Sequence, residues 1–291
     1  MPAIKVDEDR CTRCGACVAV CASAHVFELR EGAAEPVRTN DCWSCGHCVA
    51  VCPTDAIHHS DYPLDACPSL DALPSYEELI TALRARRSTR AYRDKPIPRP
   101  LVRQLVDVSR WAPSATNAQE VDWIALDEPT RIERLSREVV STLGRLVRLL
   151  QNPLLRPFLS LALGKKRVEK AAESAEDFES LVQRQSHGED PIFYHAPVVL
   201  IAHVPQGTYF GTSDAVYAAY NLMLAAERLG LGTCHIGFFN VARERNRELR
   251  DMVGLPTTRQ IEVVITLGYP RFEFRRALPR RQRELRWNPE A

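Results

Sequence analysis

The sequence has no excess of charge of either sign and no long apolar run. Its 38 Lys and Arg residues stand against 37 Asp and Glu residues, for a net charge of +1. A nucleic-acid-binding protein usually carries a clear basic excess, so nucleic acid is not expected as the main partner. No apolar run is long enough for a transmembrane helix, and residues 1–10 contain no apolar core of a secretory signal. We therefore expect a cytoplasmic protein.

Cysteine, in contrast, is abundant and unevenly placed. Eight of the ten Cys residues lie between Cys11 and Cys52. A disulfide framework suits a small secreted chain, and this chain has 291 residues and no recognisable secretory signal. Metal-bound thiols in a reducing compartment are the better interpretation. Apolar residues make up 45% of the chain and charged residues 26%, which indicates one large folded domain or two ordinary ones.

The eight cysteines form an internal repeat. Residues 11–21 and 42–52 share the spacing C-x2-C-x2-C-x3-C, with Gly after the second Cys and Val-Ala-Val before the fourth. This pattern resembles the bacterial two-cluster ferredoxins. The alternative is a pair of zinc sites, but these typically use two C-x2-C pairs rather than four Cys in one run. The first copy departs from the ferredoxin pattern at Ala22, where the family usually has the proline that Pro53 provides in the second copy.

The resemblance implies two 4Fe-4S clusters, with the fourth Cys of each run binding the cluster of the other run. The first cluster site would then consist of Cys11, Cys14, Cys17 and Cys52, and the second cluster site of Cys42, Cys45, Cys48 and Cys21. Cys67 is not expected to be a ligand, because the two runs already supply eight thiols. Three histidines lie close to these cysteines, and we expect all of them to face solvent: His47, His58 and His59.

Beyond the predicted iron–sulfur domain of residues 1–60, a Pro-rich stretch over 61–75 is typical of a semi-rigid linker. Apolar periodicity then predicts a second domain over 76–291. One helix is expected to begin at Ser75, and two more are expected over 101–108 and 214–229. The expected strands cover 121–126, 196–201 and 261–267.

Several motifs of this second part resemble the nitroreductase family of FMN enzymes. They are Arg-Arg-Ser-x-Arg at 86–90, Ala-Pro-Ser-x-x-Asn-x-Gln at 112–119, Ala-Pro-Val-Val-Leu-Ile at 196–201, the 230–237 loop Gly-Leu-Gly-Thr-Cys-His-Ile-Gly, and a strand ending in Gly-Tyr-Pro at 268–270. Each is weak alone, but together they occur in the family's order over residues 76–285. The resemblance implies an α+β fold with a mixed central sheet flanked by helices. It also implies an intertwined homodimer with FMN at the interface.

The resemblance further assigns candidate flavin contacts. The phosphate and adjacent atoms would meet Arg86, Arg87, Ser88 and Arg90, because guanidinium groups offer paired donors to a dianion. The ring edge would meet Pro113, Ser114, Asn117 and Gln119, and the glycine-rich loop would add Gly232, Thr233, Ile236 and Gly237. A basic residue of the C-terminal segment would also reach the phosphate, with Arg280 preferred over Arg276. His235 is the candidate proton donor.

These assignments have simpler alternatives. Arginine is common in this chain, so an Arg-rich helix end can be a solvated face stabilised by the helix dipole. Ser114 and Asn117 fit an ordinary Asx-type turn. His235 fits a packed polar aromatic position, and Cys234 a buried structural thiol. The glycine-rich loop does not match G-x-G-x-x-G, so no Rossmann-type NAD site is inferred.

Residues 128–190 match no cofactor pattern and separate two core motifs as a helical insertion. Its Leu-rich, Arg-interrupted periodicity fits a lid over the flavin, core packing or a dimer interface, or a basic amphipathic helix on a membrane. Periodicity alone does not choose among the three.

Together the resemblances imply an iron–sulfur flavoprotein oxidoreductase. Electrons would come from a low-potential donor such as reduced ferredoxin, pass through the clusters to FMN and reduce a small organic acceptor. A nitro compound, an activated alkene, a quinone or a halogenated compound are all open as acceptors. One alternative is an electron relay or redox sensor that acts on a protein partner without its own small-molecule substrate. Another is an enzyme that consumes its own flavin.

Overall fold

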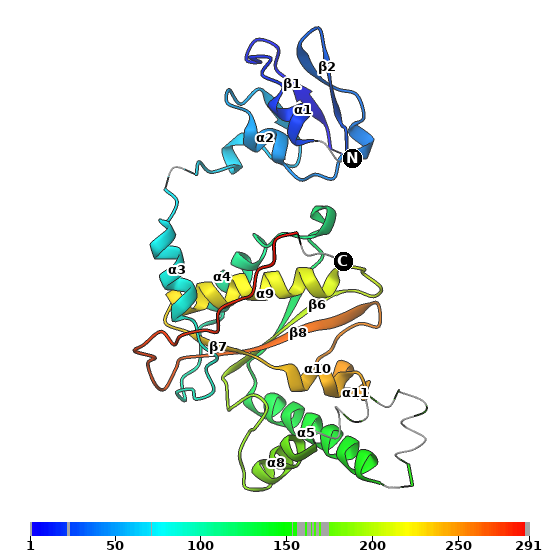
Figure 1. Ribbon diagram of the computed structural model, residues 1–291, viewed down its shortest axis with the longest axis vertical. Coiled ribbons are helices and arrows are strands. Elements are labelled where there is room, and N and C mark those ends of the chain that lie inside the picture. Colours follow the sequence, from blue (N-terminus) through cyan, green and yellow to red (C-terminus); the bar gives the residue numbers. More distant parts are fainter. Residues whose placement is uncertain are drawn as a thin grey trace. The chain divides into compact units, whose positions relative to one another are not determined.

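The computed structural model describes residues 2–288 apart from 22–23, 71, 153, 156–160, 162–163, 165, 167–168 and 170–174 (Figure 1). The chain divides into two compact units. The N-terminal unit comprises Met1–Ser75 together with Pro113–Gln119, and the C-terminal unit comprises Tyr76–Ala112 together with Glu120–Ala291. Within the described residues, no helix is long and apolar enough to cross a membrane.

The N-terminal unit consists of two small antiparallel sheets and short helices. Strand β1 (Ile4–Val6) pairs with β4 (Ile57–His59), and β2 (Phe27–Arg30) pairs with β3 (Ala33–Pro36). Helices α1 (Ala16–Val20) and α2 (His47–Val51) pack against each other, and the one-turn helices are η1 (Thr39–Asp41) and η2 (Leu64–Ala66). Tyr62 and Leu64 pack on the core of this unit, so the first residues of the predicted linker belong to it.

The internal repeat is visible in the backbone of this unit. Gly15 and Gly46 directly precede α1 and α2, and each has a left-handed φ of 73°. A side chain at such a φ is strained, whereas glycine adopts it freely. The glycine of each run therefore lets the chain turn sharply between its second and third cysteines.

The C-terminal unit is built on a four-stranded sheet with the order β5-β6-β8-β7. Its strands are β5 (Asp122–Leu126), β6 (Val198–Pro205), β7 (Gly232–His235) and β8 (Arg259–Gly268). All three pairings are antiparallel, and the described residues add a parallel component only at the isolated bridge between Ser88 and Thr233. The 230–237 segment, predicted as a loop, is therefore largely the edge strand β7.

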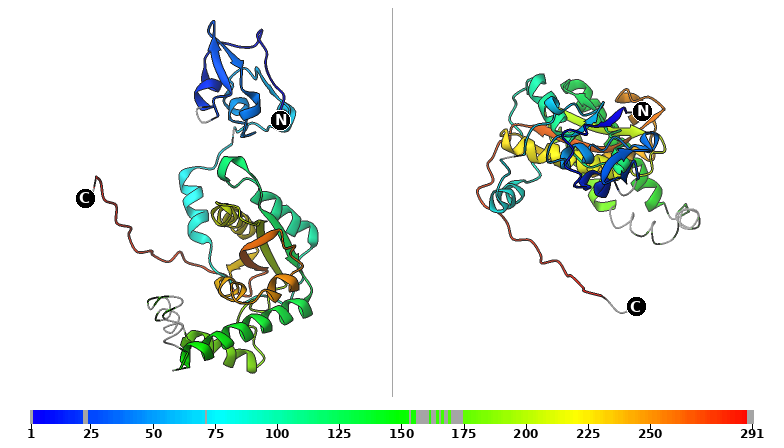
Figure 2. Two further views of the ribbon diagram at one scale, coloured as in Figure 1. Left: turned by 90° about the vertical axis from the view of Figure 1, so that its right-hand side faces the viewer. Right: turned by 90° about the horizontal axis from the view of Figure 1, so that it is seen from above.

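Helices cover both faces of this sheet (Figures 1 and 2). Strand β6 is buried on both sides, with Val199 and Ile201 in one core cluster and Val198 and Leu200 in the other. One face is covered by α4 (Arg99–Ser109) and α9 (Gly211–Arg228), and α3 (Tyr76–Ala85) contacts α9. The other face is covered by α5 (Pro129–Gln151), α8 (Ala175–Ser186), α10 (Gly237–Arg243) and α11 (Glu248–Met252). This arrangement confirms the predicted α+β class.

The described ends of the 128–190 insertion are part of the core. Leu135, Val139 and Leu143 on α5 are almost fully buried, and Phe178 and Leu181 on α8 pack in the same cluster. For these two helices the structure supports core packing among the three alternatives. A lid formed by the middle of the insertion would fall mostly on residues 152–174, most of which lie outside the described residues.

Candidate cofactor-binding sites

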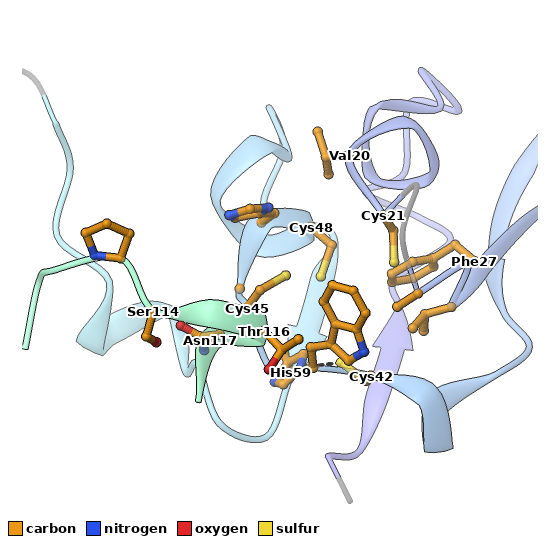
Figure 3. A pocket seen from close by; sticks show the side chains of 16 residues that line it. Val20, Cys21, Phe27, Cys42, Cys45, Cys48, His59, Ser114, Thr116 and Asn117 are labelled. Atoms are coloured by element: carbon orange, nitrogen blue, oxygen red, sulfur yellow. Dashed lines mark hydrogen bonds between the residues drawn. The ribbon is translucent and has the colours of Figure 1, made fainter. Parts of the chain in front are cut away.

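The structure gathers the eight cysteines of the repeat around two cavities in the N-terminal unit. Cys11, Cys14, Cys17 and Cys52 line the first, and Cys42, Cys45, Cys48 and Cys21 line the second (Figure 3). In each case the fourth cysteine comes from the other run. Cys21 follows directly after helix α1 and lines the second cavity, and Cys52 follows directly after helix α2 and lines the first. Cys67 lines neither cavity. Within the described residues, no three His, Cys, Asp or Glu side chains are arranged to hold a single metal ion.

Four converging thiols per cavity are the donor set that a 4Fe-4S cluster requires. The thiols differ in how readily they ionise. Burial raises the pKa of Cys48 to about 11. Burial also acts on Cys52, but the backbone N–H groups of Thr54 and Ala56 outweigh it and lower the pKa of that thiol. Because a thiolate is the ligand form, loading these cavities releases protons, most clearly at Cys48.

His59 contradicts the expectation that the nearby histidines face solvent. Its side chain is 4% exposed, whereas His47 and His58 are exposed. Successive residues of a strand point to opposite sides, so His59 follows Ile57 into the interior while His58 points outward. The His59 Nε2 atom lies 3.6 Å from Cys42 Sγ, which places the ring at the second cavity. The expectation failed because a three-residue strand gives too short a pattern to assign faces.

The segment 113–119, predicted to contact the flavin ring, lies in the N-terminal unit and lines the second cavity through Pro113, Ser114, Thr116 and Asn117 (Figure 3). Asn117 Nδ2 donates hydrogen bonds to the carbonyl O of Ser44 at 2.6 Å and to Tyr62 Oη at 3.3 Å. The exposed Gln119 donates its backbone N–H to Ser114 Oγ at 3.0 Å.

This segment also has an unusual backbone. Thr116, Asn117 and Gln119 have φ values of 52°, 56° and 51°. Such left-handed conformations cost free energy for residues other than Gly, Asn and Asp, and they are frequent at functional sites. Thr116 and Gln119 belong to the costly class, which indicates a conformation that is maintained by its contacts, among them the hydrogen bond from Asn117 to Ser44.

In the C-terminal unit, a cavity of about 520 Å³ collects the predicted phosphate ligands. It is lined by Arg86, Arg87, Ser88, Thr89, Arg90, Ala91, Phe272, Phe274, Leu278 and Arg280. Arg280 therefore lies with the Arg-Arg-Ser-x-Arg motif, and Arg276 is not among the lining residues. The 86–90 segment is held beside β7, because Thr89 N–H donates to the carbonyl O of Thr233 at 2.9 Å. Several guanidinium groups and a hydroxyl around one cavity suit an organic phosphate.

The residues predicted from the glycine-rich segment do not line this cavity; most of them form its framework. A Cβ atom on Gly232 would lie 2.3 Å from Thr89 Oγ1, so glycine is needed for the 86–90 segment to approach β7. Thr233 is buried against that segment. Ile236 is buried in the core and donates its N–H to Val264 at 2.8 Å. Gly237 begins α10.

The candidate proton donor His235 ends β7 and is exposed, and it does not line the arginine-rich cavity. Partial desolvation lowers the pKa of its ring. The neighbouring Cys234 is buried, and that burial raises the pKa of its thiol, although Arg90 and Ser88 oppose the shift. Cys234 therefore has the character of a structural thiol.

Comparisons with known proteins identify the family of each part of the chain. Residues 83–269 match the nitroreductase family, and residues 4–59 match the 4Fe-4S dicluster domain. The chain is 29% identical over 226 residues to 4-nitrobenzoate reductase of Nocardioides sp. (strain LMS-CY), an alignment that covers 71% of this chain and 86% of that protein.

Two solved structures share the fold. One is the nitroreductase with bound FMN from Bacteroides fragilis NCTC 9343, with a TM-score of 0.51 and 20% identity over 74% of this chain and 98% of that chain. The other is oxidized iodotyrosine deiodinase bound to FMN and 3-iodo-L-tyrosine, with a TM-score of 0.52 and 19% identity over 72% of this chain and 99% of that chain. The chain belongs to the nitroreductase family and carries an N-terminal 4Fe-4S dicluster domain.

Proposed function

We propose that this protein accepts electrons from a low-potential donor of the reduced-ferredoxin type and uses them to reduce a small organic compound. Membership of the nitroreductase family makes it an FMN-dependent oxidoreductase, and the dicluster domain makes it an iron–sulfur flavoprotein. When bound, the clusters supply one-electron transfer and FMN supplies two-electron reduction of the acceptor. The observation that carries the proposal is the presence, in one chain, of two four-cysteine cavities and an arginine-rich cavity.

The residues of the chain have distinct roles in this proposal. The eight cysteines of the repeat hold the two clusters. Arg86, Arg87, Arg90 and Arg280 hold the FMN phosphate by charge-assisted hydrogen bonds, and Ser88 adds a hydroxyl. Phe272 and Phe274 line the same cavity with aromatic side chains. His235 is the proposed proton donor to the reduced acceptor, and partial desolvation lowers the pKa of its ring, which makes the protonated ring a stronger acid.

An aromatic nitro compound is the first acceptor to test, because the curated relative described above is a 4-nitrobenzoate reductase. Activated alkenes, quinones and halogenated aromatics follow in the same screen. Each accepts two electrons at an electrophilic centre, so the chemistry is compatible with one flavin site.

We also propose a homodimer. Helix α9 exposes Val216, Tyr217 and Tyr220 on one side, and the C-terminal segment exposes Phe272 and Phe274. Large exposed apolar side chains that cluster on one element are typical of an interaction surface. Sedimentation of the full chain would give twice the monomer mass.

The decisive experiment is an analysis of iron and released flavin in anaerobically purified protein, followed by turnover. We expect about eight irons and one FMN per chain. Reduced ferredoxin should then support repeated reduction of 4-nitrobenzoate or another acceptor without a further protein. Bound flavin and clusters with no turnover of any small acceptor would favour the electron-relay alternative. Clusters without flavin would exclude the proposed enzyme.

A further inference from the structure

The two cysteine cavities look equivalent in burial but differ in their hydrogen bonds. In each site one thiol is exposed, one is buried and two are intermediate. Burial therefore does not distinguish them. Hydrogen bonds to cluster sulfurs and ligands are a second determinant of reduction potential, because they stabilise the additional negative charge of the reduced state.

Each site has a backbone donor to one of its thiols. Ala56 N–H donates to Cys52 Sγ at 3.2 Å in the first cluster site, and Ser44 N–H donates to Cys42 Sγ at 3.4 Å in the second. The Cys52 thiol also interacts with the backbone N–H groups of Thr54 and Ile57. Backbone donors therefore do not favour the second site.

A side-chain donor is found at the second site. Asp61 donates its backbone N–H to His59 Nδ1 at 3.2 Å. Because a backbone amide can only donate, Nδ1 is the acceptor and the proton of the neutral ring is on Nε2. That Nε2–H group faces Cys42 Sγ at 3.6 Å. The ring is also packed against Tyr62, with 5.1 Å between centroids.

The first site has no equivalent among the described residues. Thr54 Oγ1 lies 3.9 Å from Cys52 Sγ, but its hydroxyl hydrogen is donated to the carbonyl O of Arg10 at 2.7 Å.

We propose that His59, through its hydrogen bond to the ligand Cys42, raises the reduction potential of the second cluster site. The second cavity is also the one lined by Ser114, Thr116 and Asn117 of the predicted flavin-contacting segment. The Asp61 carboxylate opposes this effect, but it is solvent-exposed and its field is screened. This inference rests on the proposed function only in that both clusters must be bound.

The test is a dithionite titration of the anaerobic full-length protein, followed by electron paramagnetic resonance, with iron measured on every sample. His59→Leu removes this donor and should shift one of the two reduction steps to lower potential while leaving the other in place. We expect about a tenfold change in the reduction equilibrium constant, or 59 mV for one electron.

Two variants complete the experiment. His58→Leu, on the exposed side of the same strand, should leave both steps unchanged. His59→Gln retains a side-chain donor and should shift that step by a smaller amount, and it serves as the test if His59→Leu loses iron. Unchanged potentials in His59→Leu, or a shift to higher potential, would overturn the inference. Fewer than about eight irons in the wild-type protein would instead count against the proposed function.

Discussion

The side chain of Asn117 donates a hydrogen bond to the carbonyl O of Ser44 over 2.6 Å, and these two residues are 73 positions apart in the chain. Ser44 lies between Cys42 and Cys45, so this bond joins the 113–119 segment to the loop that presents two thiols to the second cavity. The same carbonyl also accepts the hydroxyl of Tyr62. Two donors on one carbonyl restrict the orientation of that peptide group.

We expect Asn117→Gly to loosen this loop. Glycine tolerates the left-handed φ of 56°, so the substitution removes the hydrogen bond without adding strain. A lost hydrogen bond of about 1 kcal/mol corresponds to roughly fivefold faster opening. The opening rate of the loop is measured by hydrogen–deuterium exchange of peptides that cover residues 42–48. Asn117→Asp should have a larger effect, because a carboxylate oxygen would face the carbonyl. Gln119→Asn, an exposed neighbour, is the control and should exchange like the wild type.

Gly232→Ala should destabilise the C-terminal unit. The added Cβ would lie 2.3 Å from Thr89 Oγ1 and 2.7 Å from Thr89 Cβ, so the 86–90 segment would have to move away from β7. Overpacking of this kind costs about 1–3 kcal/mol, measurable by urea denaturation. Gly237→Ala is the matched control, since no atom lies within 4 Å of its Cβ position. Equal stability of the two variants would mean that the approach of Thr89 to β7 is not needed.

The sequence predicted the elements whose pattern is long and local. Continuous apolar runs identified the buried strands β6 and β8, and small apolar residues at helical spacing identified α9. The resemblance of the cysteine repeat to two-cluster ferredoxins implied the crossed grouping of Cys21 and Cys52, and the lining of the two cavities agrees with it. In these cases the information lies within one segment or in one repeat.

The features that were missed depend on contacts between distant segments. The strand character of 232–235 arises from pairing with β8, which no local pattern encodes. Arg280 was the preferred residue and does line the arginine-rich cavity, but its position also depends on distant contacts. The chain after Gly268 is directed by hydrogen bonds from Arg93 N–H to the carbonyl O of Tyr269 and from Arg271 N–H to the carbonyl O of Ala91. The buried position of His59 and the packing of 113–119 beside cysteine residues are likewise tertiary features.

Arg280→Ala should weaken FMN retention, whereas Arg276→Ala should not. Arg280 lines the arginine-rich cavity with Arg86 and Arg87, and Arg276 does not. A hydrogen bond to a charged group contributes about 1.5–3 kcal/mol, so the dissociation constant should rise about ten- to hundredfold. Flavin fluorescence during dialysis measures this release. Arg87→Ala should behave like Arg280→Ala. Equal flavin retention in all three variants would move the phosphate site elsewhere.

Cys14→Ala and Cys45→Ala should each remove one cluster and leave the flavin in place. Both thiols are exposed, so the substitutions leave the core of the N-terminal unit intact. Each variant should lose about half of its iron, because one of two four-iron clusters is affected. The exposed Cys67, which lines neither cavity, provides the control Cys67→Ala with full iron content. Full iron in either ligand variant would contradict the ligand assignment.

His203 should make the stability of the C-terminal unit depend on pH. The side chain is 8% exposed, and its Nδ1 accepts a hydrogen bond from Arg259 Nε at 2.7 Å. Burial lowers the pKa of His203 below its usual value of 6.5, and the positive charge of Arg259 lowers it further, although Asp122 opposes the shift. As the pH falls below about 6.5, the unfolded chain takes up the proton first. The stabilisation by the neutral ring is therefore complete above about pH 6.5 and is lost as the pH falls toward the lower folded-state pKa.

We accordingly expect a smaller free energy of unfolding at pH 5 than at pH 7.5, measured by urea denaturation followed with circular dichroism. His203→Gln retains an acceptor for Arg259 but has no proton to gain in this range, so the difference between the two pH values should shrink. His58→Gln, at an exposed position, should leave that difference unchanged. The comparison isolates His203, because the contribution of every other histidine is common to the wild type and His203→Gln. An unaltered difference in His203→Gln would show that the ring is protonated equally in the folded and unfolded states.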